Sequence, residues 1–517
     1  MEPKTIGLRG RARRLVAVAA ALLLASFALA SCSGGSASGS GDGAAAGGET
    51  LTIASVVDNN SFDRADLEIG HRVHYWMPVY DTLLVLDENA EPQPNLVTEW
   101  SYNDDATVLN LHLREGVEFT DGTPFDGAAV QANLEHLANG TGQNSYMAAS
   151  IEEVEVVSDT EVNLHLSQPD PGLIGYLAVV GGAMASPKAL EASSGPVGSG
   201  PYVLEAGRTT TGSQYTFVRN EDYWNAEAFP YEEIVVKPFQ DETARLNALL
   251  AGQVDVGQID TTAIEQAEGA GLEVTRNPVD WQGLFIADRD GQAVPALGDV
   301  RVRRAINLAI DGQSILDNLL LGEGELTDQP FNPLSEAYVP ELDSYYSHDV
   351  EEARRLMAEA GYEDGFTVTM PQLQSFANYS PIISEQLSQL NIDVKWEQVS
   401  ADASISEILS GRFPMFFFSL GSQSAWQDLR KFAFPESPWN TAKVENQELS
   451  ALLDRVLEVP LEEQPAAMQE ANRWLVENAW FAPFYRVNML VANQTSVDVQ
   501  LQPWNVVPWI RDFAPAS

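Results

Sequence analysis

Two histidines, His71 and His74, stand three positions apart in a stretch that we expect to be helical over residues 68–84. On a helix this spacing places both imidazoles on one face, one turn apart, where they could share a metal ion. Two ligands at this spacing are a weak signal on their own. The adjacent Tyr75 and Trp76 fit core packing as well as a ligand platform. We therefore favour packing over metal ligation and expect no metal and no cofactor.

Other residues with catalytic chemistry have simpler roles. Asp87, Asp121 and Asp126 suggest paired-carboxylate catalysis, but they stand in turns or directly before a helical pattern. Turn formation and helix capping explain them better. Residues 198–200, Gly-Ser-Gly, resemble a phosphate loop without the lysine that would follow it, and no helix is expected to begin there. We interpret this run as tight backbone packing.

A polar loop with one tryptophan follows the apolar run FPMFFFSL at residues 413–420. The run predicts a buried strand. The loop that follows, residues 421–428, reads GSQSAWQD. Its Trp426 could stack on a sugar, a ring or an apolar side chain of a ligand, or it could pack as part of a lid. The pattern does not decide between the two.

The elements that must position these groups are clearest between residues 279 and 321. Trp281 to Ala287 has the length and residue types of a strand. Asp299 stands where a helix N-cap belongs, apolar residues then recur at helical spacing, and Gly312 is a plausible stop. Arginines occupy the first turns of this helix, where the macrodipole disfavours cations. These arginines are Arg301, Arg303 and Arg304. We expect carboxylates to face them, and we favour such pairing over a role in a ligand site.

The rest of the chain alternates between strand and helix patterns, which predicts an α/β protein with a partly parallel sheet. The expected strands include residues 49–57, 108–113, 152–166 (two strands), 234–238, 366–370, 392–399 and 480–492, and the expected helices include residues 126–137, 241–251, 349–361, 380–390, 449–457 and 468–476.

Composition limits the function. The 517 residues suffice for more than one core, and 44% hydrophobic with 20% charged residues is globular. A formal net charge of −45 argues against nucleic-acid binding, because phosphates would be repelled. We attribute the acidity to solubility in high salt before attributing it to steering of a cationic ligand. The single cysteine excludes internal disulfides and thiolate metal clusters.

The N-terminus is a targeting segment. Lysine and arginines up to Arg14 precede an apolar run, Leu15 to Ala30, that is short for a membrane span. Leu-Ala-Ser-Cys at residues 29–32 resembles the lipobox of bacterial lipoproteins, which implies a signal peptide at residues 1–31 and a lipid on Cys32. The low-complexity run up to residue 48 would then be a flexible tether of roughly 20 Å.

Several segments resemble one protein family. GDVRVRRAINLAI at residues 298–310, VYDTLLVLDENAEPQPNLVTEW at 79–100 and LHLREGVEFTDGTPFDGAAVQANLEHL at 111–137 are similar to segments of the solute-binding proteins of peptide, opine and nickel ABC importers, family 5. The resemblance implies a two-lobe, periplasmic-binding-protein-like α/β fold of type II with an extra subdomain in its first lobe. It implies these boundaries: a first lobe at 49–280 with a subdomain at about 85–190, a second lobe at 281–484, and a C-terminal return at 485–517.

The resemblance also implies a cleft between the lobes. Its expected ligand-binding residues are Asn60, His74, Trp281, Ser419, Leu420, Gly421, Ser422, Gln423 and Trp426. In the peptide-binding members the loop after residue 420 carries an aspartate that pairs with the peptide ammonium, and our register puts Ser422 there. A hydroxyl in that place loses a charge-assisted hydrogen bond of roughly 1.5–3 kcal/mol, which puts ordinary free-amine peptides in doubt. The loop also lacks the histidine that would suit nickel.

These features predict a lipid-anchored extracellular protein, monomeric, that captures a peptide or peptide-like solute and delivers it to an ABC permease in the membrane. A non-peptide solute (an oligosaccharide, an opine or a metal chelate), a sensor role and a secreted hydrolase on the same scaffold are the alternatives. The sequence has no G-x-S-x-G elbow, no H-E-x-x-H and no Walker motif, so we expect no enzyme.

Overall fold

The computed structural model describes residues 50–142, 144–192, 195–400, 403–502 and 504–516. The predicted signal peptide, Cys32 and the tether lie outside the described residues. Within them, no helix combines the length and the apolar character that crossing a bilayer requires.

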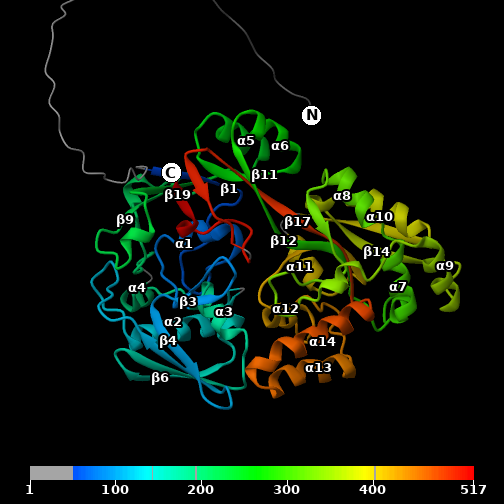
Figure 1. Cartoon of the computed structure of the whole chain (residues 1–517), viewed down its shortest axis with the longest axis horizontal. Helices are drawn as coiled ribbons and strands as arrows, with labels where there is room; N and C mark the ends of the chain where they lie inside the picture. The colour runs from blue at the N-terminus through cyan, green and yellow to red at the C-terminus, as the bar shows by residue number, and fades with distance from the viewer. Residues whose placement is uncertain (1–49, 143, 193–194, 401–402, 503, 517) are drawn as a thin grey trace, which may run out of the picture. The chain divides into compact units, whose positions relative to one another are not determined.

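A nine-stranded mixed sheet runs through the molecule in the order β16-β12-β17-β11-β1-β10-β9-β8, with β13 paired to β17. β1 lies parallel to β10 and β11, and the other pairs are antiparallel. The long strands β12 and β17 lie side by side (Figure 1). The strands are β1 Thr50–Ser55, β8 Tyr202–Leu204, β9 Tyr215–Arg219, β10 Glu233–Pro238, β11 Val256–Ile259, β12 Glu273–Ile286, β13 Gly324–Leu326, β16 Met415–Gly421 and β17 Phe481–Asn493.

The remaining strands form small sheets: a four-stranded antiparallel sheet in the order β4-β5-β7-β6, and the pairs β2-β3, β14-β15 and β18-β19. The β14-β15 pair is parallel, as the helix–strand alternation of that region predicts. These strands are β2 Leu84–Leu86, β3 Pro92–Pro94, β4 Val97–Tyr102, β5 Val108–Leu113, β6 Ile151–Ser158, β7 Glu161–Leu166, β14 Phe366–Leu373, β15 Ile392–Val399, β18 Val497–Val499 and β19 Phe513–Pro515.

Helices connect and cover these strands (Figure 1). They are α1 Val73–Trp76, α2 Gly127–Asn139, α3 Leu173–Leu177, α4 Pro187–Ala192, α5 Glu242–Leu250, α6 Ile264–Gly269, α7 Val300–Ala309, α8 Gly312–Leu319, α9 Val350–Glu359, α10 Tyr379–Ser388, α11 Ser404–Leu409, α12 Ala425–Phe432, α13 Gln447–Glu458 and α14 Gln464–Glu477.

Buried apolar side chains separate into clusters that follow the chain. Two clusters draw on residues 51–272 together with residues 490–513. Two other large clusters draw on residues 281–487. β12 and β17 are the strands that pass from one group of clusters to the other, since Val274 and Leu490 pack in the first group while Trp281 and Phe481 belong to the second.

Local signals predicted many of these elements. Asp299 caps α7 by accepting a hydrogen bond from the backbone N–H of Arg301 at 2.9 Å. Asp126 caps α2 through the N–H of Ala129, also at 2.9 Å. Asp87 and Asp121 accept backbone hydrogen bonds within turns. Turn formation and capping are therefore confirmed for all of these aspartates.

Two helix predictions were wrong in ways that have a clear physical cause. The helix expected at residues 68–84 is only one turn of 3₁₀ helix, Gly70–Arg72, followed by α1. Pro78 ends it, because proline has no N–H to give to the carbonyl of His74 and its ring clashes there. Gly312 does not end α7. That helix ends at Ala309, and Gly312 begins α8, since Asp311 caps α8 by accepting from the N–H of Ser314 at 2.9 Å.

The arginines of α7 also differ from the prediction. Arg301 pairs with the carboxylate of Asp299 at 2.5 Å, as expected. Arg303 instead donates to the backbone carbonyls of Asn478 and Ala479, and Arg304 donates to that of Glu477. These carbonyls lie at the C-terminal end of α14. The partner is thus the negative end of a neighbouring helix, where carbonyls lack helical donors, and not a carboxylate.

Candidate functional site

A cavity of about 790 Å³ lies between residues from the two groups of core clusters. This volume is within the range of small-molecule and cofactor sites. Its lining comes from Ile69, Gly70, Asn144, Tyr146, Ala149, Ser150, Ser167, Gln168, Pro169, Asp170 and Tyr176 on one side, from Val279, Asp280, Ile405, Leu409, Leu420, Gly421, Ser422, Gln423, Trp426, Arg430, Lys431, Glu436, Ser437, Pro438 and Trp439 on the other, and from Trp504, Asn505 and Val506 near the C-terminus.

Asp280 lies in β12 and faces Gly421 of β16 in the register of the antiparallel pair. Its Oδ2 accepts a hydrogen bond from Ser419 Oγ at 3.1 Å. Its Oδ1 is shielded from solvent and has no hydrogen-bond partner among the described residues. Burial raises the pKa of this carboxyl group, while the Ser419 hydroxyl and the charge of Lys431 act in the opposite direction.

A second buried carboxylate, Asp428 of α12, has a complete set of partners. Lys431 Nζ donates to its Oδ1 at 2.8 Å, and the backbone N–H of Gln423 donates to its Oδ2 at 3.0 Å. Lys431 also donates to the carbonyl of Gly421 at 2.8 Å. Burial raises the pKa of Asp428 and Lys431 opposes the rise. This ion pair therefore holds the start of α12 against the end of β16.

Trp426, in the first turn of α12, lines the cavity and is only 3% exposed. Its ring meets that of Phe434 edge to face, with centroids 5.5 Å apart. The next residue, Gln427, donates to the carbonyl of Gly172 at 3.4 Å, just before α3. A Cβ on Gly172 would lie 3.2 Å from Trp426. Helix α12 thus packs directly on the segment that leads into α3, and Trp426 combines a packing role with a place in the lining.

The wall opposite β16 holds its own charged group. Asp170 accepts hydrogen bonds from Ser150 Oγ at 2.7 Å and from the backbone N–H of Gly172 at 3.0 Å. Burial raises its pKa. Arg430, on α12, donates to Glu436 at 2.7 Å and stacks on the ring of Phe434.

Exposed apolar side chains stand on both sides of the cavity. Tyr146 is 46% exposed, and its ring meets that of Tyr176 edge to face with centroids 5.7 Å apart; Ile405 is 45% exposed. Trp439 and Trp504 add aromatic surface to the lining. The cavity therefore combines a charged end near Asp280 with apolar walls.

The structure brings together five of the predicted ligand-binding residues, since Leu420, Gly421, Ser422, Gln423 and Trp426 all line the cavity. The family resemblance implied these five residues, which lie at the end of the apolar strand and in the polar segment after it.

The other four predicted residues are not in the lining. Asn60 donates to Asp66 and Glu68 at the surface. Trp281 is 1% exposed and stacks on Phe285 in the core, with centroids 4.7 Å apart. Ser419 donates a hydrogen bond to Asp280, which lines the cavity.

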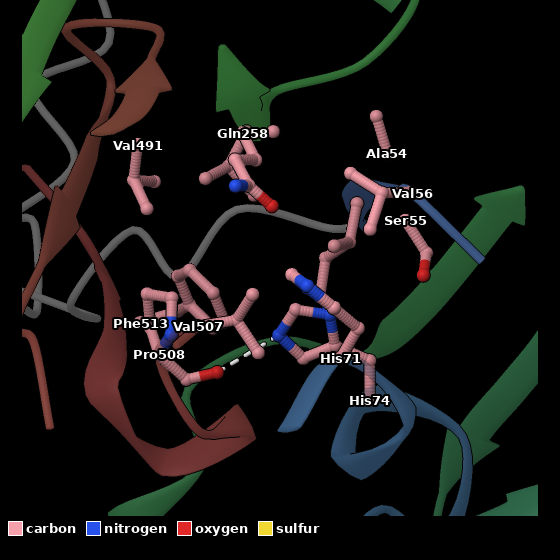
Figure 2. A pocket seen from close by; sticks show the side chains of 13 residues that line it. Ala54, Ser55, Val56, His71, His74, Gln258, Val491, Val507, Pro508 and Phe513 are labelled. Atoms are coloured by element: carbon pink, nitrogen blue, oxygen red, sulfur yellow. Dashed lines mark hydrogen bonds between the residues drawn. The ribbon is translucent and has the colours of Figure 1, made fainter. Parts of the chain in front are cut away.

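His74, the remaining predicted residue, lies elsewhere with His71. They line a separate pocket of about 10 Å³, where the Nε2 atom of His74 lies 2.8 Å from the carbonyl oxygen of Pro508 (Figure 2). Burial lowers the pKa of each imidazole to about 4, so both are neutral at pH 7. The described part of the chain contains no group of three or more potential metal ligands. The geometry here is that of core packing.

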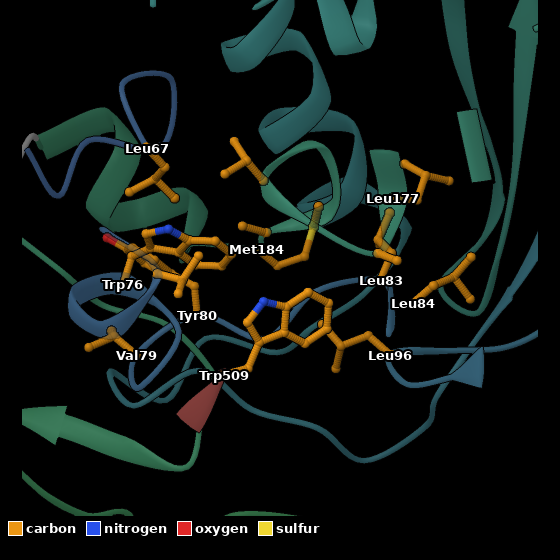
Figure 3. Packing of buried hydrophobic residues seen from close by; sticks show 14 of the residues in the cluster. Leu67, Trp76, Val79, Tyr80, Leu83, Leu84, Leu96, Leu177, Met184 and Trp509 are labelled. Carbon is orange, nitrogen blue, oxygen red and sulfur yellow. The ribbon is translucent and has the colours of Figure 1, made fainter. Parts of the chain in front are cut away.

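The C-terminal segment that carries Pro508 is fixed by the next residue. Trp509 lies in the same apolar cluster as Trp76, Leu96 and Met184 (Figure 3). Asn277 of β12 also donates hydrogen bonds to the carbonyls of Gln502 and Asn505. The packing and these hydrogen bonds together hold residues 504–506 beside the cavity.

Sequence reasoning missed the charged residues of the lining, above all Asp280, Lys431 and Asp170. Asp280 directly precedes the apolar run that begins at Trp281, and a charged residue beside a buried apolar run is a usable signal. Its position opposite Gly421 depends on strand register, which the sequence does not reveal.

Comparisons with known proteins agree with this architecture. Residues 91–433 match the model of the family described as bacterial extracellular solute-binding proteins, family 5 Middle. The glutathione-binding protein GsiB of Salmonella paratyphi A is 27% identical over 408 residues, which are 73% of this chain and 77% of that protein.

Two solved structures share the fold. DppA from Helicobacter pylori, an ABC transporter-associated periplasmic binding protein in complex with peptide STSA, has a TM-score of 0.76 at 21% identity and covers 90% of this chain and 98% of its own. NikA from Brucella suis, in complex with Fe(III)-EDTA, has a TM-score of 0.77 at 22% identity and covers 90% of this chain and 99% of its own.

The fold, the cavity and the family match define an extracellular solute-binding protein, which binds its solute and is not an enzyme. The chain belongs to the bacterial extracellular solute-binding proteins, family 5. The predicted resemblance and the predicted α/β fold of periplasmic binding proteins are confirmed.

Proposed function

We propose that this protein captures a peptide or peptide-like solute in the cavity at Asp280 and Trp426 and delivers it to an ABC import permease. The observation that carries the proposal is the cavity itself, about 790 Å³ in volume, which is lined by both groups of core clusters in a family 5 chain. Residue 170 of one wall and residue 430 of the other lie far apart in sequence, so a solute between them contacts two separately packed bodies.

These bodies are the proposed lobes, a first lobe at residues 49–280 with a subdomain at about 85–190, and a second lobe at 281–484, with residues 485–517 returning to the first. Support comes from the buried apolar clusters, because one part of β12 and β17 packs in the first group of clusters and the other part packs in the second group. Bound solute favours a closed arrangement only through contacts with both walls, so capture is a population shift between open and closed states.

Several features favour a peptide among the possible solutes. The lining alternates charged groups with aromatic and aliphatic surface, as a peptide alternates backbone polar groups with side chains. The relatives include a protein named for glutathione binding and one solved with the peptide STSA. The structure with Fe(III)-EDTA keeps a metal chelate as the second candidate.

A thermal-shift screen over glutathione, short peptides, oligosaccharides, opines and metal chelates tests the proposal. A solute that binds only the native state, present at 100 times its Kd, stabilises that state by about 2.7 kcal/mol, so peptides should raise the Tm. Ser422→Trp, which fills the lining, should abolish the shift, whereas Ser388→Trp on the exposed end of α10 should keep it. A screen in which no solute raises the Tm contradicts the proposal. Recovery of a chemically altered solute after long incubation would favour a hydrolase.

The lipid anchor is part of the proposal and rests on residues 29–32, Leu-Ala-Ser-Cys, followed by a glycine- and serine-rich tether. The anchor would keep a monomeric binding protein on the extracytoplasmic face of the membrane, within reach of the permease. Cys32→Ser should move the protein from the membrane fraction to the soluble fraction, as measured by fractionation and immunoblotting. Equal membrane association of both forms would contradict the anchor.

A further inference from the structure

A second cavity, of about 180 Å³, is lined by residues that lie within 77–229 and at 509–511. It shares no lining residue with the solute cavity at Trp426. A narrow space of about 20 Å³ is lined by residues of both cavities, such as Met77 of the second and Trp504 of the first. That space holds little more than one water molecule. The second cavity is therefore a separate place with room for a small ligand.

Aromatic rings form the walls of the second cavity, and a buried carboxylate fixes two of them. Tyr223 and Trp224 have ring centroids 5.6 Å apart. Asp81 accepts hydrogen bonds from the Tyr223 hydroxyl at 2.9 Å, from Trp224 Nε1 at 3.2 Å and from Ser199 Oγ at 3.1 Å. The other aromatic rings of the lining are those of Tyr80, Phe229 and Trp509. The two rings on Asp81 are held before any ligand arrives, which reduces the entropy lost on binding.

Arg511 also lines this cavity, and its guanidinium lies between two of the rings. Its Cζ is 5.1 Å from the centroid of the Trp509 ring. Burial raises the pKa of Tyr223, and the nearby charge of Arg511 opposes the rise. Because Trp509 and Tyr223 both line the cavity, the guanidinium between them is at the cavity wall.

The guanidinium of Arg511 has no hydrogen-bond acceptor in the described part of the chain. Its Nε lies 3.8 Å from Asp512 Oδ1, beyond hydrogen-bond distance. The oxygens of Asp512 accept from Gln502 Nε2 at 2.9 Å and from the backbone N–H of Trp509 at 2.7 Å. The side chain of Arg511 is only 25% exposed, so water reaches little of it. A carboxylate can accept two N–H donors of one guanidinium at once, which makes it the acceptor that arginine suits best.

We propose that this cavity is a second ligand site, which binds a small aromatic carboxylate with its ring against Tyr223 and Trp224 and its carboxylate on Arg511. A cavity of about 150 Å³ accommodates benzene, so about 180 Å³ accommodates one ring with a carboxylate group. Exposed residues of the lining, Asn225 and Ala228, connect the cavity to solvent. The site is separate from the proposed peptide site and takes a different class of ligand.

Benzoate is the probe, offered to the whole protein, with benzamide and acetate as matched ligands. Benzamide keeps the ring without the charge, and acetate keeps the charge without the ring. Titration calorimetry supported by saturation-transfer NMR compares the three Kd values. We expect benzoate to bind at least about fivefold more tightly than either, because only benzoate combines ring packing with a charge-assisted hydrogen bond.

Variants then assign the contacts. Arg511→Gln removes the charge and should weaken benzoate binding by about 5- to 20-fold while leaving that of benzamide unchanged. Ala228→Trp puts a large ring into the cavity from an exposed position and should abolish benzoate binding. Arg355→Gln removes an exposed arginine of α9 and is the matched control, with the Kd of the wild type. Unchanged melting temperatures verify folding, and Ala228→Trp keeps the test valid if Arg511→Gln fails to fold.

Ser422→Trp, which fills the lining of the solute cavity, separates the two sites. Benzoate binding that this variant keeps and that Arg511→Gln and Ala228→Trp lose supports the second site. No benzoate binding by the wild type, equal binding of benzamide, or an unchanged Kd in Ala228→Trp overturns it. Loss of benzoate binding in Ser422→Trp overturns it as well, because benzoate would then lie in the solute cavity. These outcomes leave peptide capture to the solute screen.

Discussion

Two of the regions that contain buried polar atoms without hydrogen-bond partners differ in charge and in the space around those atoms. In the pocket at His71 and His74, the Nδ1 atoms are unpartnered, but both imidazoles are neutral at pH 7 and the pocket holds about 10 Å³. At Asp280 the unpartnered atom belongs to a carboxylate that lines about 790 Å³. Of these two regions, only the second combines an unpartnered carboxylate oxygen with a cavity large enough for a solute.

Two buried carboxylates at or beside the cavity differ in the same way. Asp280 and Asp428 are both buried, and burial raises the pKa of both. Asp428 has Lys431, whereas Asp280 has only the Ser419 hydroxyl. Asp428 is therefore part of a structural ion pair, whereas Asp280 has no cation as a hydrogen-bond partner among the described residues.

The largest expected effect concerns the paired carboxylate. Lys431→Met leaves Asp428 buried without its cation, which should lower the free energy of unfolding by about 3–5 kcal/mol in urea denaturation. Adding Asp428→Asn to Lys431→Met should recover most of this loss. Full stability of the single variant would mean that Asp428 does not depend on the pair.

The histidine pocket should respond to pH. The folded-state pKa of each imidazole is about 4, below its ordinary value of 6.5, so the folded state prefers the neutral form. The resulting stability is fully present above pH 6.5 and is lost as the pH falls towards 4, by up to about 3 kcal/mol for each group.

Measuring the free energy of unfolding between pH 7 and pH 4.5 for the wild type and for His71→Leu with His74→Leu tests this. The wild type should lose more stability than the variant. Asp81 changes stability in the opposite direction, because burial raises its pKa to about 6, but it contributes equally to both proteins. Identical pH profiles would show that the histidines are not buried as neutral groups.

A smaller effect is expected at the unpaired carboxylate when no solute is present. Asp280→Asn removes a buried charge without a cation, so the free energy of unfolding should stay the same or rise by about 1 kcal/mol. Asp428→Asn, which removes the partner of Lys431, should instead destabilise the protein. A marked loss of stability in Asp280→Asn would place Asp280 with the structural carboxylates.

The smallest effect concerns metal. Zn²⁺ should change the Tm of the wild type no more than that of His74→Leu, because neutral His71 and His74 share a pocket of about 10 Å³ without a third ligand nearby in the described chain. A zinc-dependent rise in Tm that His74→Leu abolishes would restore metal ligation as the role of the pair.

Much of the fold could be predicted because its signals are local. The caps at Asp126 and Asp299 and the alternation of β5 depend on neighbours a few residues away. The helix expected at residues 68–84 failed because its apolar pattern continued past Pro78, and the proline outweighed the pattern. The carboxylates expected at Arg303 and Arg304 failed because the actual partner, the end of α14, is more than 170 residues away in sequence.

The sequence by itself determined that this is an acidic α/β protein of the solute-binding class, with a buried strand near residues 413–420. Local propensity, hydrophobic period and family motifs suffice for those conclusions. The loop expected at residues 421–428 was wrong in part, because α12 begins at Ala425 and contains Trp426. Only the tertiary structure decided that Asp280 accepts a hydrogen bond from Ser419, 139 residues away, and that Lys431 donates to Asp428 and not to Asp280. Strand register and the partner of a buried charge are set by long-range pairing, which no local pattern encodes.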